Sequence, residues 1–457
     1  MALVSINPAT EVVLAHFDED TEAVLEEKLE RSRVAFDRWR RTSFATRAHL
    51  IGQLAEELRR NRTHYARLAT LEMGKPIKEA EAEVEKCAWA ADYFAENAER
   101  FLTPVELPSS ATRSIAYWRP LGPILAVMPW NFPFWQAMRA AIPALMAGNV
   151  ALLKHASNVP QCSRAIEASF LEAGLPEGVF QSLMIGSGPV GQLIQDGRVA
   201  AVTLTGSELA GARVAQEAGR AMKKCVLELG GSDPFIVLED ADVELAATVA
   251  CRARNQNNGQ SCISAKRFIV ADEVADDFER RFSQKVAALR VGDPMEAGTE
   301  IGPLARADLV DALTDQLDRS IAQGATTLVG GRPVAGRGYY FEPTVAAVPD
   351  GASAVMKEET FGPLAAVVRV RDEAEALRVA NDSPYGLGAA IFTTPERGER
   401  LSVEVEAGMV FVNALVASDP RLPFGGVKRS GYGRELSEFG IREFMNLQTV
   451  SVGPAQP

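Results

Sequence analysis

The stretch AAVTLTGSELAG, residues 200–211, joins a short apolar run to a glycine and then to the start of a helix. The run Ala200–Leu204 has the length of a buried strand, and Ser207 is a good residue to cap the helix that follows. A strand that leads directly into a helix is the repeating unit of parallel sheets. The stretch therefore predicts an α/β fold.

Similar apolar runs lie on both sides of this stretch. They are Ile124–Met128, Val150–Leu153, Val226–Leu229, Phe235–Leu238, Arg267–Val270, Thr326–Val329, Ala365–Val370, Ala389–Phe392 and Met409–Val412. Helical patterns separate many of them, at 273–289 and 307–323 for example, and residues 21–96 are also helical in pattern. We expect two α/β units with mostly parallel sheets.

Two segments do not follow this alternation. Residues 103–120 contain two short extended pieces around a Ser-Ser turn, which predicts a hairpin-like arm. The tail Met445–Val452 is a predicted strand without a partner nearby in sequence, so it pairs with another element or with another subunit. Residues 120–138 carry no charge, but several prolines interrupt any helix there, which predicts buried core and no membrane span.

The chain is acidic, with 48 Lys+Arg against 60 Asp+Glu in 457 residues and a net charge of −12. A field of that sign repels nucleic acid and anionic membranes, so neither is expected as a partner. The five cysteines are odd in number and widely spaced, and no Cys/His cluster has metal-ligand spacing. We therefore expect free thiols, a cytoplasmic protein and no metal site. The N-terminus lacks a basic segment, so no signal peptide is expected.

One cysteine has the surroundings of a nucleophile. Cys262 lies among small polar residues in NNGQSCISAKR (257–267), immediately before a strand, where a substrate has room to approach. The other four cysteines lie in helical patterns or beside strands, as buried, inert thiols do. None of the four histidines is placed to serve Cys262 as a base, so another residue must do so.

Two polar residues lie in apolar surroundings. Glu228 stands between two leucines on a predicted strand and precedes a Gly-Gly pair, and burial would raise its pKa toward the range of a general base. The alternative is a strand-edge glutamate that faces solvent. Asn131 lies between the two prolines of PWNFP (129–133), where its amide could donate to an oxyanion or serve only to form a turn.

Two Gly-rich stretches are candidates for binding phosphate. Residues 186–191, GSGPVG, match G-x-G-x-x-G, but no acidic residue ends the next strand as the dinucleotide fingerprint requires. Gly206, Ser207 and Gly211 follow a strand directly and open a helix, so we prefer this stretch as the pyrophosphate site. Lys154 ends a strand and could reach a ribose or a phosphate, or could be an ordinary surface lysine.

Taken together, these residues resemble the aldehyde dehydrogenase superfamily over nearly the whole chain. Eight motifs occur in the family order: EMGKP (72–76), PWNFP (129–133), LLKHAS (152–157), TGSELAG (205–211), ELGGSDP (228–234), GQSC (259–262), EETFGP (358–363) and PFGGVKRSGYGRE (423–435). Each motif alone is modest evidence, whereas eight in register are specific.

The resemblance implies a fold of three parts. They are a Rossmann-type cofactor-binding domain (1–102 and 122–227), an α/β catalytic domain (228–430), and a β oligomerisation arm with a C-terminal tail (103–121 and 431–457). The C-terminal strand would join the sheet of a neighbouring subunit, so a homodimer or homotetramer is expected.

The resemblance also implies a mechanism. The Cys262 thiolate attacks the aldehyde carbon, while the Asn131 amide and the Cys262 backbone N–H bind the oxyanion. Hydride passes to the nicotinamide, and Glu228 then activates the water that releases the acid from the thioester.

The implied cofactor residues follow from the same motifs. Gly206 and Ser207 would bind the pyrophosphate, Lys154 the adenosine ribose and Glu359 the nicotinamide ribose. The other expected cofactor residues are Trp130, Ser157, Gly211, Leu229 and Phe361. Many NAD-specific relatives carry Glu where Ser157 stands, and a carboxylate there would repel a 2′-phosphate. Either NADP or NAD is therefore expected, with NADP accepted because of Ser157.

The expected substrate is a small aldehyde that carries a carboxylate. Arg139 directly follows the uncharged segment, where either capping or a salt bridge at a surface, or else an anionic ligand, would explain it. In the succinate-semialdehyde branch of the family, which this chain resembles, an Arg at this place binds the substrate carboxylate. Ser418 and Arg421 are candidates for the same group. Some relatives carry a second Arg six residues before the nucleophile, and this position is Gln256 here. Glutarate semialdehyde or a neutral aldehyde therefore remains an alternative substrate.

Two alternatives belong to other classes of function. One is a cofactor-free cysteine ester hydrolase that uses Cys262 and Glu228. The other is a structural protein that has the fold and no activity, which the presence of Cys262, Glu228 and Asn131 disfavours.

Overall fold

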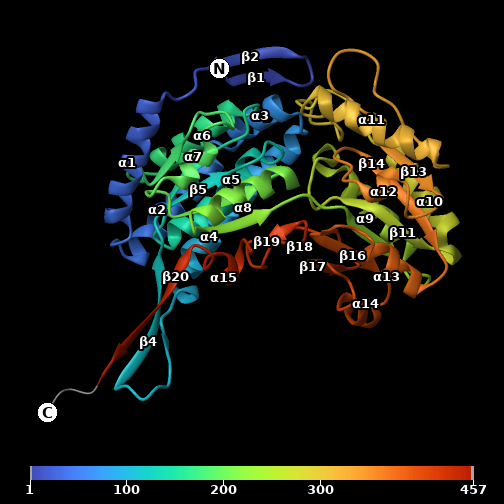
Figure 1. Ribbon diagram of the computed structural model, residues 1–457. Coiled ribbons are helices and arrows are strands. Elements are labelled where there is room, and N and C mark those ends of the chain that lie inside the picture. Colours follow the sequence, from blue (N-terminus) through green and yellow to red (C-terminus); the bar gives the residue numbers. More distant parts are fainter. Residues whose placement is uncertain (1–2, 454–457) are drawn as a thin grey trace.

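The computed structural model describes residues 3–453 and contains two large sheets, each covered by helices on both faces, and a small projecting sheet (Figure 1). The six-stranded sheet has the order β19 (Gly431–Tyr432), β9 (Lys224–Glu228), β8 (Ala201–Thr205), β5 (Pro123–Val127), β6 (Val150–Lys154) and β7 (Phe180–Ser182). All of its strands except β19 run parallel.

The strand order of this sheet reverses beside its central strand. The chain passes from β5 to β6 and β7 on one side, and then returns to place β8 and β9 on the other side of β5. Val127 at the end of β5 lies opposite both Lys154 of β6 and Leu204 of β8. The residues that follow these strands therefore meet at one edge of the sheet, at the switch point where open α/β sheets bind ligands.

Two groups of helices bury this sheet. One face packs against α1 (Glu22–Trp39), α7 (Val190–Gln195) and α8 (Glu208–Arg220). The other packs against α2 (Phe44–Arg60), α3 (Arg62–Met73), α4 (Ile77–Phe101), α5 (Pro133–Met146) and α6 (Pro160–Glu172). Both faces of the strands are apolar for this reason, which is why they appear in the sequence as continuous apolar runs.

The seven-stranded sheet has the order β12 (Thr326–Val329), β13 (Thr344–Val348), β14 (Leu364–Val370), β11 (Ala265–Ala271), β10 (Asp233–Val237), β16 (Gly388–Phe392) and β17 (Met409–Val412). Only β12 is antiparallel to its neighbour. One face is covered by α9 (Val243–Asn255) and α10 (Asp272–Ala287). The other is covered by α11 (Ala307–Ala322), α12 (Ala354–Lys357), α13 (Glu373–Asn381) and α14 (Pro395–Ser402).

The third sheet is the projecting arm at the lower left of Figure 1, with the order β20 (Met445–Val452), β4 (Arg113–Pro120) and β3 (Val105–Glu106). β20 pairs with β4 along its whole length. The C-terminal strand thus finds a partner in the hairpin of its own chain, which is the first of the two alternatives that the sequence left open. Its second edge is unpaired within residues 3–453.

The predicted strands are all present, with bounds that differ by one or two residues at most. The sequence analysis did not find β7, β13 or the N-terminal hairpin of β1 (Leu3–Asn7) and β2 (Val12–Phe17). β7 is only three residues long, and β2 is largely exposed, so neither has an apolar run to detect. The domain boundaries stay a prediction, although β19 joins the six-stranded sheet from within the segment assigned to the tail.

The uncharged segment is buried core, as predicted. It forms β5, a loop and α5, and every residue of α5 is buried. Across the described chain, no helix has both the length and the apolar character needed to cross a membrane.

The start of α5 is determined by a carboxylate from another helix. The residue before α5 provides no side-chain cap, and the Phe134 and Trp135 N–H groups donate instead to Glu83 of α4, at 2.8 and 2.9 Å. Glu83 also forms a buried ion pair with Lys75, whose ammonium lies 4.0 Å from the centroid of the Phe132 ring. A carboxylate at a helix N-terminus is favoured by both hydrogen bonding and the helix dipole.

Removing this carboxylate should destabilise the protein. In Glu83→Ala the Lys75 ammonium is left buried without its partner, which costs about 3–5 kcal/mol of the free energy of unfolding. Urea unfolding followed by tryptophan fluorescence measures the loss. The control is Glu85→Ala on the same helix, whose exposed pair with Arg59 is 2.9 Å long and should contribute less than about 1 kcal/mol. Equal losses in the two variants would contradict the proposed cap.

Candidate active site

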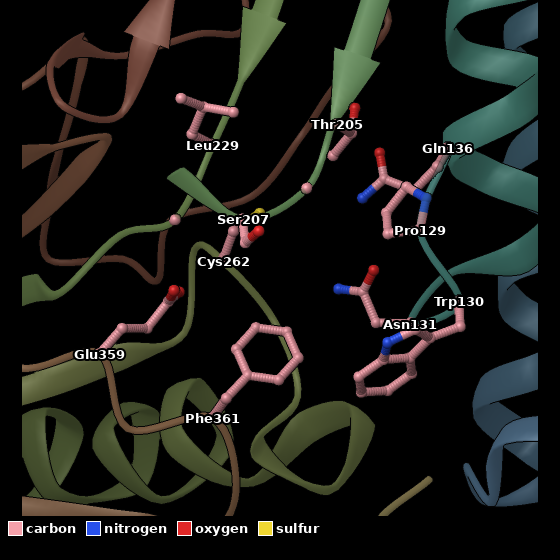
Figure 2. Close-up of a pocket in the computed structure, with 12 residues that line it drawn as sticks. Pro129, Trp130, Asn131, Gln136, Thr205, Ser207, Leu229, Cys262, Glu359 and Phe361 are labelled. Atoms are coloured by element: carbon pink, nitrogen blue, oxygen red, sulfur yellow. The ribbon is translucent and has the colours of Figure 1, made fainter. Parts of the chain in front are cut away.

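Two cavities meet at Cys262. The first has a volume of about 190 Å³ and is shown in Figure 2, and the second has a volume of about 300 Å³. Cys262 lines both of them, and among the described cysteines it alone does so. A thiol at the junction of two cavities can contact a different ligand on each side.

The loop before Cys262 has an unusual backbone. Asn257 and Asn258 have φ angles of 57° and 56°, in the left-handed region that Asn tolerates better than most residues. Asn258 Nδ2 donates to the carbonyl oxygens of Gly74 and Pro303, both at 2.9 Å, which anchors the loop to two other segments.

Gly259 is required by packing as well as by its backbone angle. Its φ is +71°, and a Cβ at this position would collide with the carbonyl group of Gly362 in the EETFGP motif. Two of the motifs that carried the family resemblance therefore contact each other, and the contact sets the position of the nucleophile loop.

The Cys262 thiol is protonated at neutral pH in the free protein. Burial raises its pKa to about 11, while Arg139 and Lys266 act in the opposite direction. Lys266 lies directly beneath the loop, and its Nζ donates to the Ser261 and Cys262 carbonyl oxygens at 2.9 and 2.8 Å. The thiol must therefore lose a proton before it can act as a nucleophile.

Asn131 lies across the first cavity from Cys262. Its side chain is buried, and its Nδ2 atom donates to the Gln260 carbonyl oxygen at 3.0 Å. The backbone carbonyl oxygen of Asn131 accepts from Asn257 Nδ2 at 2.9 Å. An amide NH₂ carries two donors, so one remains for an oxygen atom in the cavity. Figure 2 shows the amide nitrogen directed into the cavity.

Glu228 ends β9 and is 2% exposed, so the alternative of a glutamate facing solvent was wrong. Its pKa is raised well above the usual range by burial and then by the neighbouring Glu435. Glu228 does not line either cavity, and its carboxyl group lies beside Gly425, where a Cβ would approach Oε1 to 2.7 Å. The carboxyl group therefore lies outside both cavities, where burial favours its neutral form.

The first cavity also contains most of the expected cofactor residues: Trp130, Gly206, Ser207, Leu229, Glu359 and Phe361. Ser207 caps α8 as predicted, with Oγ accepting from the Ala210 N–H at 3.4 Å. Gly211 packs against Leu229, so closely that a Cβ would lie 2.6 Å from its Cδ2 atom. α8 is thereby held against β9, with its N–H groups at the edge of the cavity.

Glu359 reaches the same edge from the seven-stranded sheet side. Its Oε1 accepts from the Gly231 N–H at 3.0 Å, and Lys266 Nζ lies 3.6 Å from the same oxygen. A Cβ at Gly230 would collide with this carboxylate. The Gly-Gly pair of the ELGGSDP motif thus leaves room for Glu359.

Lys154 and Ser157 lie further along the sheet edge. Lys154 is buried, which lowers its pKa, so it is not an ordinary surface lysine. Ser157 lines a third cavity, of about 550 Å³, together with Gly186 and Gly188. The two Gly-rich stretches therefore occupy different parts of one edge. This edge carries the N-terminus of α8, the Glu359 carboxylate, which could bind a ribose, and the cavity at Ser157. Together these features fit an extended dinucleotide.

The expected substrate residues are not all brought together. Arg139 and Ser418 line the second cavity with Cys262, whereas Arg421 does not. Arg421 is exposed and donates to Asp419 at 2.6 Å, so its expected contact with substrate is corrected by the structure. Its charge is held by a neighbour two residues away.

Arg139 has a partner of its own inside the protein. It is 2% exposed, forms an ion pair with Glu435, and lies 4.3 Å from the centroid of the Phe424 ring. Burial raises the pKa of Glu435, and Arg139 opposes that rise. The alternative expected from the sequence, a cap or a salt bridge at a surface, was therefore wrong, because this ion pair is buried.

The sequence analysis missed four residues of the site, namely Glu83, Lys86, Gln136 and Glu435. Glu83 had a detectable signal, because it interrupts the apolar stripe that α4 buries with Ala80, Cys87 and Phe94. A charge in such a stripe indicates a buried partner. Within the described residues, no group of His, Cys, Asp and Glu could hold a metal ion.

A dinucleotide-type sheet edge with a cysteine between two cavities defines a dehydrogenase that works through a thiol. The aldehyde dehydrogenase family model matches residues 2–450. A probable NADP-dependent succinate-semialdehyde dehydrogenase of Synechocystis sp. is 50% identical over 452 residues, which cover 98% of this chain and 99% of the relative. An NAD(P)-dependent succinate semialdehyde dehydrogenase of Escherichia coli is 47% identical, covering 98% and 97%.

Solved structures agree with these relatives. Succinic semialdehyde dehydrogenase from Streptococcus pyogenes, solved in complex with NADP⁺, has a TM-score of 0.97 and 40% identity, and covers 99% of this chain and 100% of that one. The chain belongs to the aldehyde dehydrogenase family. The predicted family, fold class and enzyme class are confirmed.

The pKa of Cys262 makes a direct prediction for its reactivity. Below a pKa of about 11, the thiolate fraction increases about tenfold for each pH unit, and the thiolate is the reactive form. Iodoacetamide labelling of Cys262 in the free protein should accelerate by that factor as pH rises. Mass spectrometry of the peptide measures the rate, with Cys262→Ala as the blank. A rate that does not change with pH would mean that the thiolate already exists at neutral pH.

Proposed function

We propose that this protein oxidises succinate semialdehyde to succinate with NADP or NAD as electron acceptor. The observation that carries the proposal is the position of Cys262 between two cavities, one with a dinucleotide-type edge and one lined by cationic side chains. An aldehyde with an anionic tail suits the second cavity, because its tail can lie among the cations while its carbonyl carbon faces the thiol. The names of the relatives support the same substrate.

The first half of the reaction uses Cys262 and Asn131. The thiolate attacks the aldehyde carbon, and the free N–H of the Asn131 amide donates to the oxygen that becomes negative, together with the Cys262 backbone N–H. The nicotinamide cofactor, when bound, supplies the acceptor for the hydride. Cys262 is then left as a thioester.

The second half requires Glu228 to move. In the described structure its carboxyl group has a raised pKa and lies beside Gly425. Rotation toward Cys262 and loss of its proton would allow Glu228 to accept a proton from water as the water attacks the thioester. A raised pKa makes the carboxylate a stronger base once it is formed.

Several residues would hold the cofactor along the sheet edge. The N–H groups at Gly206 and Ser207 suit the pyrophosphate, and the Glu359 carboxylate suits ribose hydroxyls. Lys154 and Ser157 suit the adenosine ribose, and the absence of a carboxylate at Ser157 leaves room for a 2′-phosphate. Trp130, Gly211, Leu229 and Phe361 would shape the surrounding walls.

We also propose that the arm joins subunits into a homodimer or homotetramer. The second edge of β20 is open in the described chain, and Leu447, Val450 and Val452 on this strand are exposed. An open edge with apolar side chains is a surface that another strand covers in an assembled protein. The five free thiols suit a reducing compartment such as the cytoplasm.

The first test is an assay of reduced-nicotinamide absorbance with succinate semialdehyde and butanal, each with NADP and with NAD. We expect kcat/KM to be at least about tenfold higher for the semialdehyde, the value of one charge-assisted contact. Cys262→Ala should abolish turnover. Equal values for the two aldehydes would overturn the substrate proposal, and ester hydrolysis without any nicotinamide would favour the cysteine hydrolase.

The proposed role of Glu228 predicts a kinetic signature. Glu228→Gln should still form the thioester, because the residue acts only in its hydrolysis. We expect a stoichiometric burst of reduced nicotinamide and then a steady rate about 10²–10⁴-fold below that of the wild type. Stopped-flow absorbance measures both phases. Loss of the burst together with the steady rate would instead place Glu228 in the attack step.

A further inference from the structure

The second cavity is lined by acidic and basic side chains, and only some of them have a partner of opposite charge. Glu79, Glu83 and Lys86 project into it from one side of α4. Glu83 is bound to Lys75 and to two backbone N–H groups. Glu79 accepts from the Asn257 N–H at 2.6 Å. Both carboxylates therefore have partners in the protein walls.

Lys86 has no such partner. Its Nζ donates to Ser418 Oγ at 2.5 Å and lies 4.5 Å from the centroid of the Trp135 ring. In the part of the chain that the structure describes, no carboxylate comes within 4 Å of this ammonium. Asp419, next to Ser418, is bound to Arg421 instead. A half-buried ammonium whose partners are a hydroxyl and an aromatic ring favours binding of an anion.

The other two cations of the cavity are less suited to an anion. Arg139 already forms its ion pair with Glu435, so its charge is matched inside the protein. Arg252 also lines the cavity, but it is exposed and its charge is solvated by water. Among the described residues that line this cavity, Lys86 is the cation that remains for a ligand.

We propose that Lys86, together with the hydroxyl of Ser418, binds the carboxylate of the aldehyde substrate and sets the preference of the enzyme for semialdehydes. The hydroxyl accepts from Lys86 and keeps its own hydrogen to donate to a carboxylate oxygen. Lys86 and Arg139 thus have different tasks, because Arg139 is paired with Glu435 beside Glu228. The inference rests on the proposed function, since it requires a substrate with a carboxylate.

The position of Lys86 also makes substrate choice dependent on pH. Burial, followed by Arg139 on α5, lowers the pKa of Lys86 to about 8, against the opposite effect of Cys87 and Glu83 on α4 and of Asp419. The ammonium is present below this pKa and is lost above it. Binding of a carboxylate should therefore weaken as pH rises through about 8, while binding of a neutral aldehyde should not change.

The test compares Lys86→Met, Lys86→Arg and the control Lys78→Met, an exposed lysine on the same helix. In Lys86→Met we expect KM for succinate semialdehyde to rise by about 10- to 100-fold, the value of a charge-assisted hydrogen bond, with KM for butanal within about twofold of the wild type. Lys86→Arg should recover most of the loss, and Lys78→Met should change neither value. An unchanged KM for the semialdehyde in Lys86→Met would overturn the inference.

A measurement on the wild-type protein needs no substitution and so does not depend on the folding of a variant. The ratio of kcat/KM for succinate semialdehyde to kcat/KM for butanal should fall as pH rises through about 8. The ratio cancels the titration of Cys262 and Glu228, because both aldehydes use those groups. In Lys86→Arg the ratio should be constant over the same range. A constant ratio in the wild type would contradict the inference.

The outcomes separate this inference from the proposed function. If the wild type does not prefer succinate semialdehyde to butanal, the proposed function fails before Lys86 is considered. If the wild type has the preference and Lys86→Met retains it, the function stands and the assignment of Lys86 fails. Arg139 or Arg252 would then be the residue to replace.

Discussion

The buried ion pair between Lys75 and Glu83 sets the positions of both walls of the site. Glu83 determines where α5 begins, and α5 is the helix that follows Asn131 and carries Arg139. The segment just before α4 also anchors the nucleophile loop, because the Gly74 carbonyl oxygen accepts from Asn258. The positions of Asn131 and of the loop before Cys262 thus both depend on contacts with one short segment, residues 74–83. A shift of that segment would therefore move both at once.

The charged groups around Cys262 lie in separate regions of the site. The edge toward the dinucleotide-type cavity presents N–H groups and one carboxylate, Glu359. The interior behind β9 holds Glu228 and Glu435, of which Glu435 is paired with Arg139, and burial raises the pKa of both acids. Two carboxyl groups that share one cation are harder to ionise together than either is alone. An acid with a raised pKa that can turn toward the thioester would provide the base for the proposed second half of the reaction.

Much of the fold was predictable from local patterns. Parallel strands buried on both faces form continuous apolar runs, and α8 begins at a serine that the sequence marks as a cap. Short or exposed strands such as β7 and β2 have no such run and were missed. Local patterns also did not show the partner of β20, because β4 lies more than three hundred residues earlier; only the family resemblance placed the two strands in one arm. The alternation of side chains along a strand does not identify a partner that is distant in sequence.

The amino-acid sequence by itself determined the family, the α/β class and the identity of Cys262, because eight motifs and the small residues around the thiol are local features. Only the tertiary structure decided the roles of the charged residues. In the folded protein Arg139 forms an ion pair with Glu435, Arg421 forms one with Asp419, and Lys86 donates to Ser418. The physical reason is that a charge acts through the groups within a few ångströms of it, and in a buried site those groups come from distant parts of the chain.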